Sequence, residues 1–355
     1  MDLLELQRQV VDRAIRAPWK VAQAPVRAAQ LATAELGERE FDVALERPNF
    51  RLRRYEPEPE TARHVPVVFT YPFINDPSIL DFRPERSVIG GLLDGGFPGY
   101  VFEWKDASRI ERSLTLGDYV DRFLGECVDV ARGEAGADGV HLLGYSTGAP
   151  IAASFAALRP DAVRSLVLLG PPLDFEAGDA VEALRIQAEN QDLDQLADTL
   201  DVVPSQAIEA VLLGRKPVEL GVTNPLRLWD QLDSDEYVED VGRKLDWLAG
   251  GPILPETMVR QFLEDLVIGN RLIRNELRLN GSRVDLERVD MPVCLFLGTE
   301  DEYVPRNASV PFLDAIASED TTVIEVPTGH VGLSAAPEAH EEGWPRVGEW
   351  LVERS

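Results

Sequence analysis

Lysine is scarce in this sequence, and its scarcity accompanies a large acidic excess. The 355 residues include 35 basic and 62 acidic side chains, which gives a formal net charge of −27 at pH 7. A surface of this kind keeps a protein soluble when molar salt screens charge and strengthens hydrophobic association. The composition favours a halophilic protein over an acidic mesophilic one, and the lack of a basic stripe argues against nucleic acid as a partner. The four lysines are Lys20, Lys105, Lys216 and Lys244.

Cysteine and histidine are also few, which limits the chemistry open to the chain. The two cysteines, Cys127 and Cys294, lie in apolar surroundings far apart in the sequence, as expected of buried thiols in a reducing compartment. There are four histidines, and neither a C-x-x-C nor an H-E-x-x-H pattern occurs. We therefore expect no disulfide framework, no metal site and no cofactor.

Long apolar runs are absent as well. No stretch approaches the roughly 20 apolar residues of a membrane-spanning helix. The N-terminus, Met1-Asp2-Leu3-Leu4-Glu5, lacks the apolar core of a signal peptide. The sequence predicts a cytoplasmic protein without a transmembrane segment.

Short apolar runs alternate with amphipathic stretches over much of the chain. This alternation predicts an α/β fold with a mostly parallel sheet covered by helices on both faces. The expected strands are 65–71, 100–104, 139–143, 165–169, 293–298 and 321–326. Helices are expected at 87–93, 116–132 and 338–352.

The alternation stops in the middle of the chain, at a segment that is polar, helical in pattern and broken by prolines. Without an obvious strand, this segment is predicted to be a helical cap inserted into the sheet domain. The predicted parts are an N-terminal helical arm (1–45), the first half of the core (46–175), the cap (176–285) and the second half of the core (286–355).

The arm contains amphipathic helical stretches at 2–16 and 26–36. Such stretches usually face a protein core, so the arm is expected to pack on the domain. The alternative is a docking surface for a partner subunit or an apolar particle.

The pentapeptide Gly144-Tyr145-Ser146-Thr147-Gly148 follows an apolar run and precedes an alanine-rich helical stretch. A strand, then G-x-S-x-G, then a helix is the pattern of a nucleophile elbow, where a sharp turn exposes a serine above the sheet. The turn strains the backbone at the serine and leaves room only for small neighbours, which accounts for the two glycines. Ser146 is therefore the predicted nucleophile.

A serine nucleophile needs a base, and His330 is the best candidate. It lies in a glycine-bracketed loop, Pro327-Thr328-Gly329-His330-Val331-Gly332, after the last expected strand. Functional residues are frequent on loops that a rigid scaffold holds. The alternative is a loop histidine that caps a helix or bonds the backbone.

The base in turn needs a carboxylate that orients it, and we predict Asp301 for this role. Glu300 and Glu302 compete for the role from the sequence alone, and Asp174 is a rival that fits a helix cap better. The D-x-x-V-P spacing after the strand at 293–298 favours Asp301. The order Ser, Asp, His along the chain is that of the α/β-hydrolase fold.

The oxyanion of an acyl-transfer reaction needs backbone N–H donors. One donor is expected from Thr147, directly after the nucleophile. The other is expected from the loop after the strand at 65–71, at Phe73 or Ile74. The three other histidines are expected outside the site, with His64 and His141 structural and His340 facing solvent.

Beyond these motifs, the chain resembles the polyhydroxyalkanoate synthases, in particular the short catalytic subunits of the two-subunit class. The similar segments are short, but they span most of the chain, and the stretch from about 176 to 280 contains little of them. They are 71–81, 87–96, 114–128, the elbow, 172–176, 280–281, 284–286, 301–305, 329–332 and 344–355.

The resemblance implies an α/β-hydrolase fold with a cap, and it places the nucleophile, acid and base at Ser146, Asp301 and His330. It also implies an acyltransferase that polymerises (R)-3-hydroxyacyl-coenzyme A thioesters, releases coenzyme A and works at an intracellular polyester granule. A second, non-catalytic subunit is the partner that it implies.

Three positions depart from the family's pattern. Ser146 stands where the family has cysteine, Ala149 where the elbow usually continues with a second glycine, and Glu103-Trp104-Lys105 where the family has Asp-Trp-Gly. The serine matters most, because cysteine is the stronger nucleophile and exchanges acyl groups readily with thioesters. Two alternatives therefore stay open: a serine hydrolase of the same fold (polyester depolymerase, esterase or acyl-CoA thioesterase) and a non-catalytic paralogue that binds granules or an active synthase.

Overall fold

The structure is a computed structural model of the chain, and its described residues fall into two compact units. The larger unit comprises residues 37–205 and 251–355, and the smaller one residues 1–36 and 206–250. The expected amphipathic stretch at 2–16 lies outside the described residues. The structure describes residues 20, 23, 25–31, 37, 39–58, 60, 62–177, 179–190, 200–208 and 224–355.

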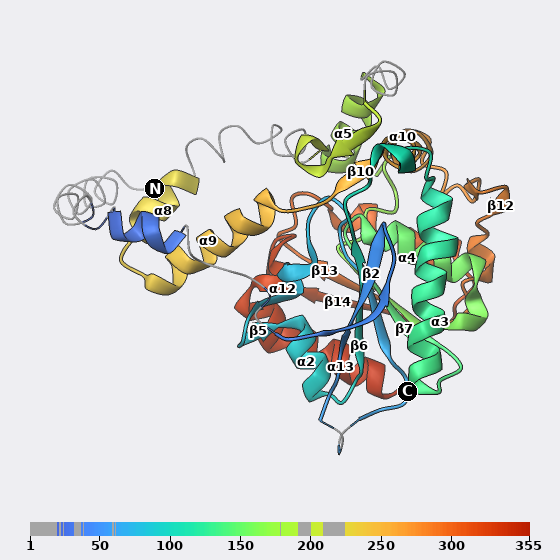
Figure 1. The fold of residues 1–355 in the computed structure, drawn as a ribbon, viewed down its shortest axis with the longest axis horizontal. Helices are drawn as coiled ribbons and strands as arrows, with labels where there is room; N and C mark the ends of the chain where they lie inside the picture. Colours follow the sequence, from blue (N-terminus) through green and yellow to red (C-terminus); the bar gives the residue numbers. More distant parts are fainter. Residues whose placement is uncertain are drawn as a thin grey trace. The chain divides into compact units, whose positions relative to one another are not determined.

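An eight-stranded sheet runs through the larger unit (Figure 1). Its order is β1-β2-β6-β3-β7-β8-β13-β14. β2 is antiparallel to both of its neighbours, whereas the strands from β6 to β14 in that order are parallel. The strands are β1 (Asp42–Glu46), β2 (Phe50–Tyr55), β3 (Val67–Thr70), β6 (Gly99–Trp104), β7 (Val140–Tyr145), β8 (Val163–Leu169), β13 (Val293–Gly298) and β14 (Thr321–Val326).

The central parallel strands are covered on both faces. Every residue of β3, β7 and β13 is buried, so these strands show continuous apolar runs in place of alternation. This explains why all six parallel strands could be predicted from the sequence with only small shifts at their ends.

β1 and β2 have no counterpart among the predicted strands. In β2 the buried Phe50, Leu52 and Tyr55 are interleaved with arginines, a mixed pattern that is typical of an antiparallel strand near a sheet edge. Because β1 begins at Asp42, the sheet starts before residue 46, where the sequence analysis begins the core.

Helices cover both faces of the sheet (Figure 1). α2 (Val88–Asp94) contacts α13 (Trp344–Val352), and α4 (Gly148–Leu158) contacts the π-helical turn Asp118–Phe123 that continues into α3 (Leu124–Ala135). α13 likewise follows a π-helical turn. The three expected helices are thus present, two of them beginning with a wider turn. Further short helices are α11 (Phe312–Ala315) and α12 (Gly332–Ala335).

The segment predicted as an all-helical cap also contains strands. β9 (Val202–Pro204) pairs with β10 (Ile253–Pro255), and β11 (Arg278–Leu279) pairs with β12 (Ser282–Arg283). The expectation of no strand is therefore wrong, because strands of two or three residues are too short to show a period. Its role as a cap stays a prediction. The described α-helices of the segment are α5 (Asp179–Glu189), α8 (Asn224–Asp230), α9 (Asp235–Ala249) and α10 (Glu256–Gln261).

In the smaller unit, side chains of the N-terminal arm bind the ends of α8 and α9. Residues 25–31 are helical. Lys20 Nζ donates to the carbonyl oxygens of Trp229 (2.5 Å) and Asp230 (2.8 Å) at the end of α8, where a cation favours the helix dipole. Arg27 forms an ion pair with Asp235 in the first turn of α9. The described part of the arm therefore contacts part of the inserted segment.

The strand order creates a switch point beside β3. From β3 the chain crosses to β6 on one side and then returns to β7 on the other. Ligands of open parallel sheets bind at such a point, in the crevice outside the carboxyl ends of the strands. The residues directly after β3 and β7 are therefore expected to form a site.

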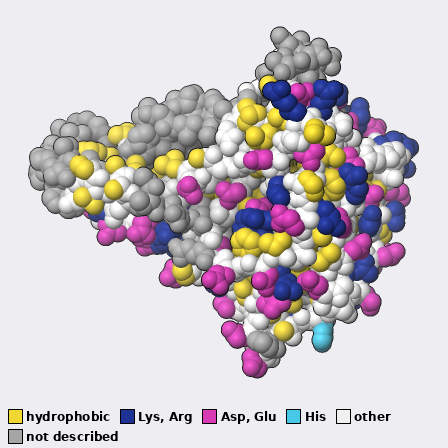
Figure 2. Space-filling model, in the orientation of Figure 1, with side chains coloured by type: hydrophobic (Ala, Val, Ile, Leu, Met, Phe, Trp, Pro, Cys, Tyr) yellow, Lys and Arg dark blue, Asp and Glu magenta, His cyan; other side chains and the backbone are white. Residues whose placement is uncertain are grey.

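The surface carries both signs of charge. Figure 2 shows Asp and Glu side chains spread over the face in view and interspersed with Arg and Lys. None of the helices in the described ranges combines the length and the apolar character that crossing a bilayer requires.

Candidate active site

Ser146 lies at the turn between β7 and α4, in a backbone conformation that few residues adopt. Its φ is +50°, and the other described non-glycine residues with positive φ are three asparagines, which tolerate this region better. The Ser146 N–H donates to the Leu169 carbonyl (2.9 Å), and the Ser146 carbonyl accepts from the Ala149 N–H (2.9 Å). A strained residue that neighbours hold in this way indicates a functional site.

Close packing requires both glycines of the elbow. A Cβ added to Gly144 would lie 2.7 Å from the Cβ of Ala152. One added to Gly148 would lie 2.4 Å from the carbonyl oxygen of Thr70, the last residue of β3. The Thr70 hydroxyl also donates to the Gly148 carbonyl (2.9 Å). The end of β3 is therefore in contact with the elbow, and the loop after β3 begins beside the nucleophile.

His330 lies between the nucleophile and an acid. Its Nε2 is 2.8 Å from Ser146 Oγ, and its Nδ1 is 2.6 Å from Asp301 Oδ2. When Nδ1 carries the proton and donates it to the carboxylate, Nε2 is left to accept a hydrogen bond from the serine hydroxyl. The structure thus brings together the three residues that the sequence predicted as a triad.

Asp301 differs from the acids beside it in burial. Its side chain is 1% exposed, whereas Glu300 and Glu302 are exposed. Its Oδ1 accepts from the N–H groups of Tyr303 (2.9 Å) and Val304 (2.8 Å), which leaves Oδ2 for the histidine. The backbone therefore fixes the carboxylate in place, and of the three acids the structure brings Asp301 to His330.

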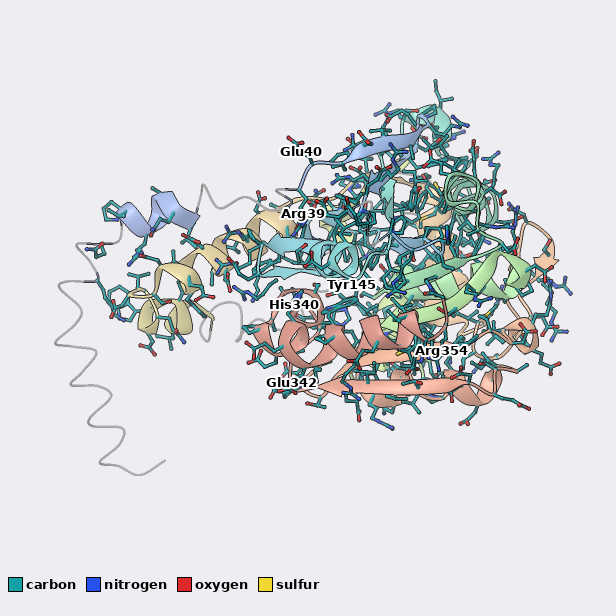
Figure 3. All side chains as sticks on the ribbon, turned by 90° about the horizontal axis from the view of Figure 1, so that it is seen from below. Arg39, Glu40, Tyr145, His340, Glu342 and Arg354 are labelled. Atoms are coloured by element: carbon teal, nitrogen blue, oxygen red, sulfur yellow. The ribbon has the colours of Figure 1, made fainter. Side chains whose placement is uncertain are left out.

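Two residues that support His330 were missed by the sequence analysis. The Tyr145 hydroxyl donates to the His330 carbonyl oxygen (3.0 Å), and Tyr145 is labelled in Figure 3. Gly170, with φ +46°, lies so close that an added Cβ would be 3.0 Å from the imidazole Nδ1. In the sequence, Tyr145 is visible only as the first variable position of G-x-S-x-G. Gly170 is visible only as a glycine directly after an expected strand.

The expected oxyanion donors lie on two segments around Ser146. Thr147 directly precedes α4, where the first N–H groups of a helix have no intrahelical acceptor. Phe73 and Ile74 lie in the turn after β3, which a hydrogen bond from the Asn75 N–H to the Pro72 carbonyl closes (3.1 Å). Both remain candidates for the second donor.

His141 is a buried residue of β7. Its Nδ1 lies 2.7 Å from Ser165 Oγ and its Nε2 lies 3.1 Å from Ser355 Oγ. Burial, helped by the nearby Arg164, lowers the pKa of His141 to about 3. His141 is therefore neutral and structural, as expected, and His64 is exposed.

His340 and Asp174, which the sequence also singled out, make contacts outside the triad. The expectation that His340 faces solvent is wrong, because its Nε2 lies 2.8 Å from the Ser334 carbonyl and burial lowers its pKa. The acids around it in the sequence suggest a polar helix face, but the helix turns the imidazole inward. Asp174 accepts from the Glu176 N–H (3.0 Å), which closes a local turn, and from the amide of the distant Asn270 (2.8 Å).

The described residues contain no group of three or more His, Cys, Asp or Glu side chains that could hold a metal ion. Cys127 and Cys294 are buried, and burial raises the pKa of Cys294 to about 12 and that of Cys127 well above its usual range. Thiols of this kind are poor nucleophiles at neutral pH. Both cysteines are structural.

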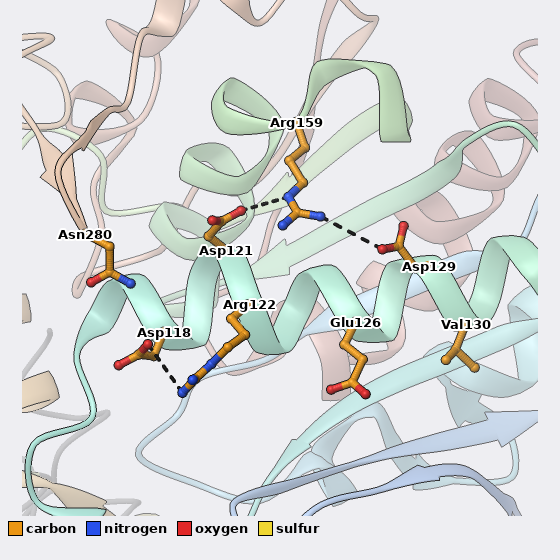
Figure 4. A pocket seen from close by; sticks show the side chains of 8 residues that line it. All are labelled: Asp118, Asp121, Arg122, Glu126, Asp129, Val130, Arg159 and Asn280. Atoms are coloured by element: carbon orange, nitrogen blue, oxygen red, sulfur yellow. Dashed lines mark hydrogen bonds and ion pairs between the residues drawn. The ribbon is translucent and has the colours of Figure 1, made fainter.

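A cleft of about 700 Å³ lies along α3 and the turn before it (Figure 4). Its charged side chains pair with one another: Arg159 with Asp121 (2.7 Å) and Arg122 with Asp118 (3.3 Å). None of the triad residues lines this cleft.

Known proteins share this fold. Residues 82–337 match the family model of the alpha/beta hydrolase fold. A soluble variant of monoglyceride lipase from Saccharomyces cerevisiae has a TM-score of 0.53 at 14% identity, over 91% of this chain and 97% of that chain. A thermophilic esterase from Thermogutta terrifontis has a TM-score of 0.50 at 16% identity, over 90% and 99%. The expected α/β-hydrolase fold is confirmed.

The proteins that are similar in sequence identify the family more narrowly than the shared fold does. The poly(3-hydroxyalkanoate) polymerase subunit PhaC of Haloferax mediterranei is 37% identical over 352 residues, 99% of this chain and 72% of that protein. The subunit of the same name from Haloarcula marismortui is 35% identical over 359 residues, 99% and 76%. That of Allochromatium vinosum is 33% identical over 305 residues, 86% and 85%. The chain therefore belongs to the family of poly(3-hydroxyalkanoate) polymerase PhaC subunits, which confirms the resemblance that its motifs carry.

Proposed function

We propose that this chain is a polymerase subunit that makes polyester from (R)-3-hydroxyacyl-coenzyme A thioesters, with Ser146 as its nucleophile. The observation that carries the proposal is the hydrogen-bonded row of Ser146, His330 and Asp301 at the carboxyl ends of the strands. The relatives' name, poly(3-hydroxyalkanoate) polymerase, supplies the reaction class. A paralogue that only binds granules would have no need of such a triad, so we do not favour that alternative. A second subunit and a polyester granule are the partners that go with this proposal.

In the first half-reaction, Ser146 Oγ attacks the thioester carbonyl carbon while His330 Nε2 accepts the hydroxyl proton. Asp301 holds the imidazole in place and stabilises its charged form. The N–H groups of Thr147 and of Phe73 or Ile74 bind the negative charge that develops on the carbonyl oxygen. The C–S bond then breaks, coenzyme A leaves as a thiol with the proton from His330, and the acyl group stays on Ser146 as an oxoester.

In the second half-reaction, the 3-hydroxyl group of another monomer or of the growing chain attacks the acyl-serine. His330 accepts the proton of this hydroxyl and returns it to Ser146 Oγ. One ester bond forms and one ester bond breaks, so this step is close to balanced in free energy. The thioester consumed in the first step drives the cycle.

Ser146 itself favours a second candidate, a serine hydrolase of the same fold. A serine stands where the resemblance implies cysteine, and acyl-serines are the intermediates of esterases. If water instead of a 3-hydroxyl group attacks the intermediate, the product is a free hydroxyacid. The two candidates therefore share the first half-reaction and differ only in the acceptor.

One assay separates the candidates. The purified protein in molar salt is given (R)-3-hydroxybutyryl-coenzyme A, with and without a candidate second subunit, and free thiol and product size are followed together. Thiol release with polymer supports the polymerase, and thiol release with only free hydroxyacid supports the hydrolase. No thiol release would contradict the polymerase and the acyl-CoA thioesterase, and would direct attention to polyester cleavage or a binding role. Ser146→Ala is expected to abolish thiol release, whereas Ser282→Ala, at an exposed serine, should not.

A further inference from the structure

The larger unit resumes at Gly251, after residues 206–250, and there the chain meets the loop after β3. Gly251 has a φ of +111°, a region that side-chain-bearing residues rarely adopt. A Cβ added at this position would lie 2.4 Å from the carbonyl oxygen of Ile74 and 3.0 Å from its carbonyl carbon. The backbone of Gly251 therefore packs directly against the carbonyl group of Ile74.

Short strands hold Gly251 in this position. It directly precedes the segment in which β10 pairs with β9, and the N–H of Ser205 at the end of β9 donates to the Pro252 carbonyl (3.1 Å). β10 is also bound to the segment after β6, where the Ala107 N–H donates to the Ile253 carbonyl (2.8 Å). These hydrogen bonds therefore fix the residues that directly follow Gly251.

Ser205 completes the contact. It is fully buried, and its Oγ has no hydrogen-bond partner among the described residues. The Cβ added to Gly251 would lie 2.5 Å from this Oγ, so it would be caught between Ser205 and Ile74. Larger side chains are excluded at position 251 from both directions.

Aromatic packing holds the loop on its other side. The Phe73 ring lies edge-on to Phe262, with 4.8 Å between the ring centroids, and to Trp104, with 5.8 Å between them. The loop is therefore held at Phe73 by these rings and at the Ile74 carbonyl by the Gly251 backbone. The two contacts flank the N–H of Ile74 and follow that of Phe73 in the chain, so both restrict the segment that carries the candidate donors.

We propose that Gly251 is a positioning residue, which holds the loop Pro72–Asn75 so that its N–H donor points at the oxyanion. The proposal rests on the function proposed above and deepens it. An oxyanion donor acts only when it lies about 2.7–3.1 Å from the developing charge, so a small displacement of the loop weakens transition-state binding more than substrate binding.

Gly251→Ala tests the proposal. The added Cβ pushes the Ile74 carbonyl away, and we expect kcat for thiol release to fall by about tenfold or more while KM changes by less than about twofold. The control is Gly281→Ala, in the turn between β11 and β12. Gly281 has φ +85° and nothing within 4 Å of an added Cβ, so this variant introduces backbone strain without the clash. Its kcat should stay near that of the wild type.

A second substitution separates positioning from general destabilisation. Ser205→Ala removes the Oγ that holds the added Cβ against Ile74, so Ser205→Ala/Gly251→Ala should regain part of the lost kcat. If Gly251→Ala does not fold, this double variant is compared with Ser205→Ala in its place, and a lower kcat with unchanged KM is expected. Circular dichroism and the melting temperature are recorded for each variant.

The outcomes distinguish a failure of the proposed function from a failure of the positioning role of Gly251. A wild-type protein that releases no thiol overturns the proposed function whatever the variants do. An active wild type with equal kcat in Gly251→Ala and Gly281→Ala, or in the double variant and Ser205→Ala, overturns the positioning role alone. A rise in KM without a fall in kcat would also overturn it.

Discussion

At the residue scale, the Asp301 carboxylate is the member of the triad with the most constrained surroundings. One oxygen accepts two backbone N–H groups and the other lies 2.6 Å from His330 Nδ1. The carboxylate therefore has no freedom to rotate away from the histidine. This arrangement fixes both the orientation and the tautomer of the imidazole.

Replacement of this acid provides a direct test. Asp301→Asn keeps the shape of the side chain but removes its charge and favours the wrong tautomer of His330. We expect kcat for thiol release to fall by roughly 10³–10⁴-fold. The matched control is Glu300→Gln at the exposed neighbouring position, which should leave kcat unchanged. Similar activities for the two variants would contradict the assignment of Asp301.

His141 gives a residue-scale prediction about pH. Burial lowers its folded-state pKa to about 3 from an ordinary value of 6.5. Below pH 6.5 the unfolded chain binds a proton that the folded chain does not, so the free energy of unfolding falls as pH drops from about 6.5 toward 3. The contribution of His141 to this slope is up to about 1.4 kcal/mol per pH unit.

Denaturant titrations at several pH values between 6.5 and 4.5 measure this slope. His141→Gln should flatten it, whereas His64→Gln, at an exposed histidine, should leave it as in the wild type. Equal slopes in all three proteins would show that His141 is not buried as a neutral group.

Much of the candidate site could be predicted at the residue scale, because its members lie in local motifs. Ser146 and His330 follow strands in glycine-rich turns whose spacing is visible in the sequence. The D-x-x-V-P spacing favoured Asp301 over Glu300 and Glu302, but the burial that distinguishes Asp301 from them could not be read from the sequence. Gly251 could not be predicted, because its contact is with a residue far away in the chain.

At the element scale, a half-buried ion-pair cluster joins β2 to β6. Glu103 accepts hydrogen bonds from Arg53 (2.6 and 2.8 Å) and from Arg51, which lies opposite it in the strand register. Burial alone would raise the pKa of Glu103, but the two guanidinium groups outweigh it and lower the pKa. The cluster therefore holds the antiparallel strand β2 on the parallel part of the sheet.

Glu103→Gln removes the charge and leaves two arginines unpaired. We expect the free energy of unfolding at pH 7 to fall by about 3 kcal/mol. Because the folded pKa of Glu103 is lowered, its contribution is present above pH 4.5 and is lost as pH falls below that value. The difference between variant and wild type should shrink accordingly in denaturant titrations at lower pH.

Glu126→Gln is the control for this prediction. Glu126 pairs with Arg47 at the surface, where the two side chains are 36% and 44% exposed. Loss of this pair should therefore lower the free energy of unfolding by less than about 1 kcal/mol. An equal fall in the free energy of unfolding in the two variants would show that the Glu103 cluster stabilises the protein no more than a surface ion pair does.

Elements differed in how well they could be predicted. β13 and β14 have the bounds expected from their apolar runs. β2 was missed because arginines interrupt its apolar positions, and two of them, Arg51 and Arg53, bind Glu103 across the sheet. Such a strand is recognisable only with its partner, since its polar residues are explained by cross-strand pairing.

At the scale of the whole molecule, net charge is the dominant feature. A charge of −27 on 355 residues repels itself when salt is low, and the PhaC relatives from Haloferax mediterranei and Haloarcula marismortui are haloarchaeal proteins. Molar salt shortens the screening length to about 3 Å and strengthens hydrophobic association. Both effects favour the folded state.

The melting temperature should therefore rise with NaCl concentration, most steeply below about 1 M, where screening changes most. Thermal unfolding followed by circular dichroism from low to molar salt measures this dependence. A melting temperature that is flat over this range would contradict the halophilic interpretation.

The division of the chain into two units could not be predicted from the sequence. The predicted arm and insertion are separate parts, whereas the described residues of 1–36 and 206–250 belong to one unit. The contacts that join them, such as Lys20 with the end of α8, link residues about two hundred positions apart. An amphipathic helix indicates that its apolar face packs against another surface, but it does not indicate which segment of the chain provides that surface.

The most direct test of the account is to locate the covalent intermediate. The protein is mixed with (R)-3-hydroxybutyryl-coenzyme A, quenched in acid, digested and analysed by peptide mass spectrometry. We predict a hydroxybutyryl group on the peptide that contains Ser146, and its absence from Ser146→Ala treated in the same way. An acyl group on Cys127 or Cys294, or thiol release without any acyl-enzyme on Ser146, would contradict the account.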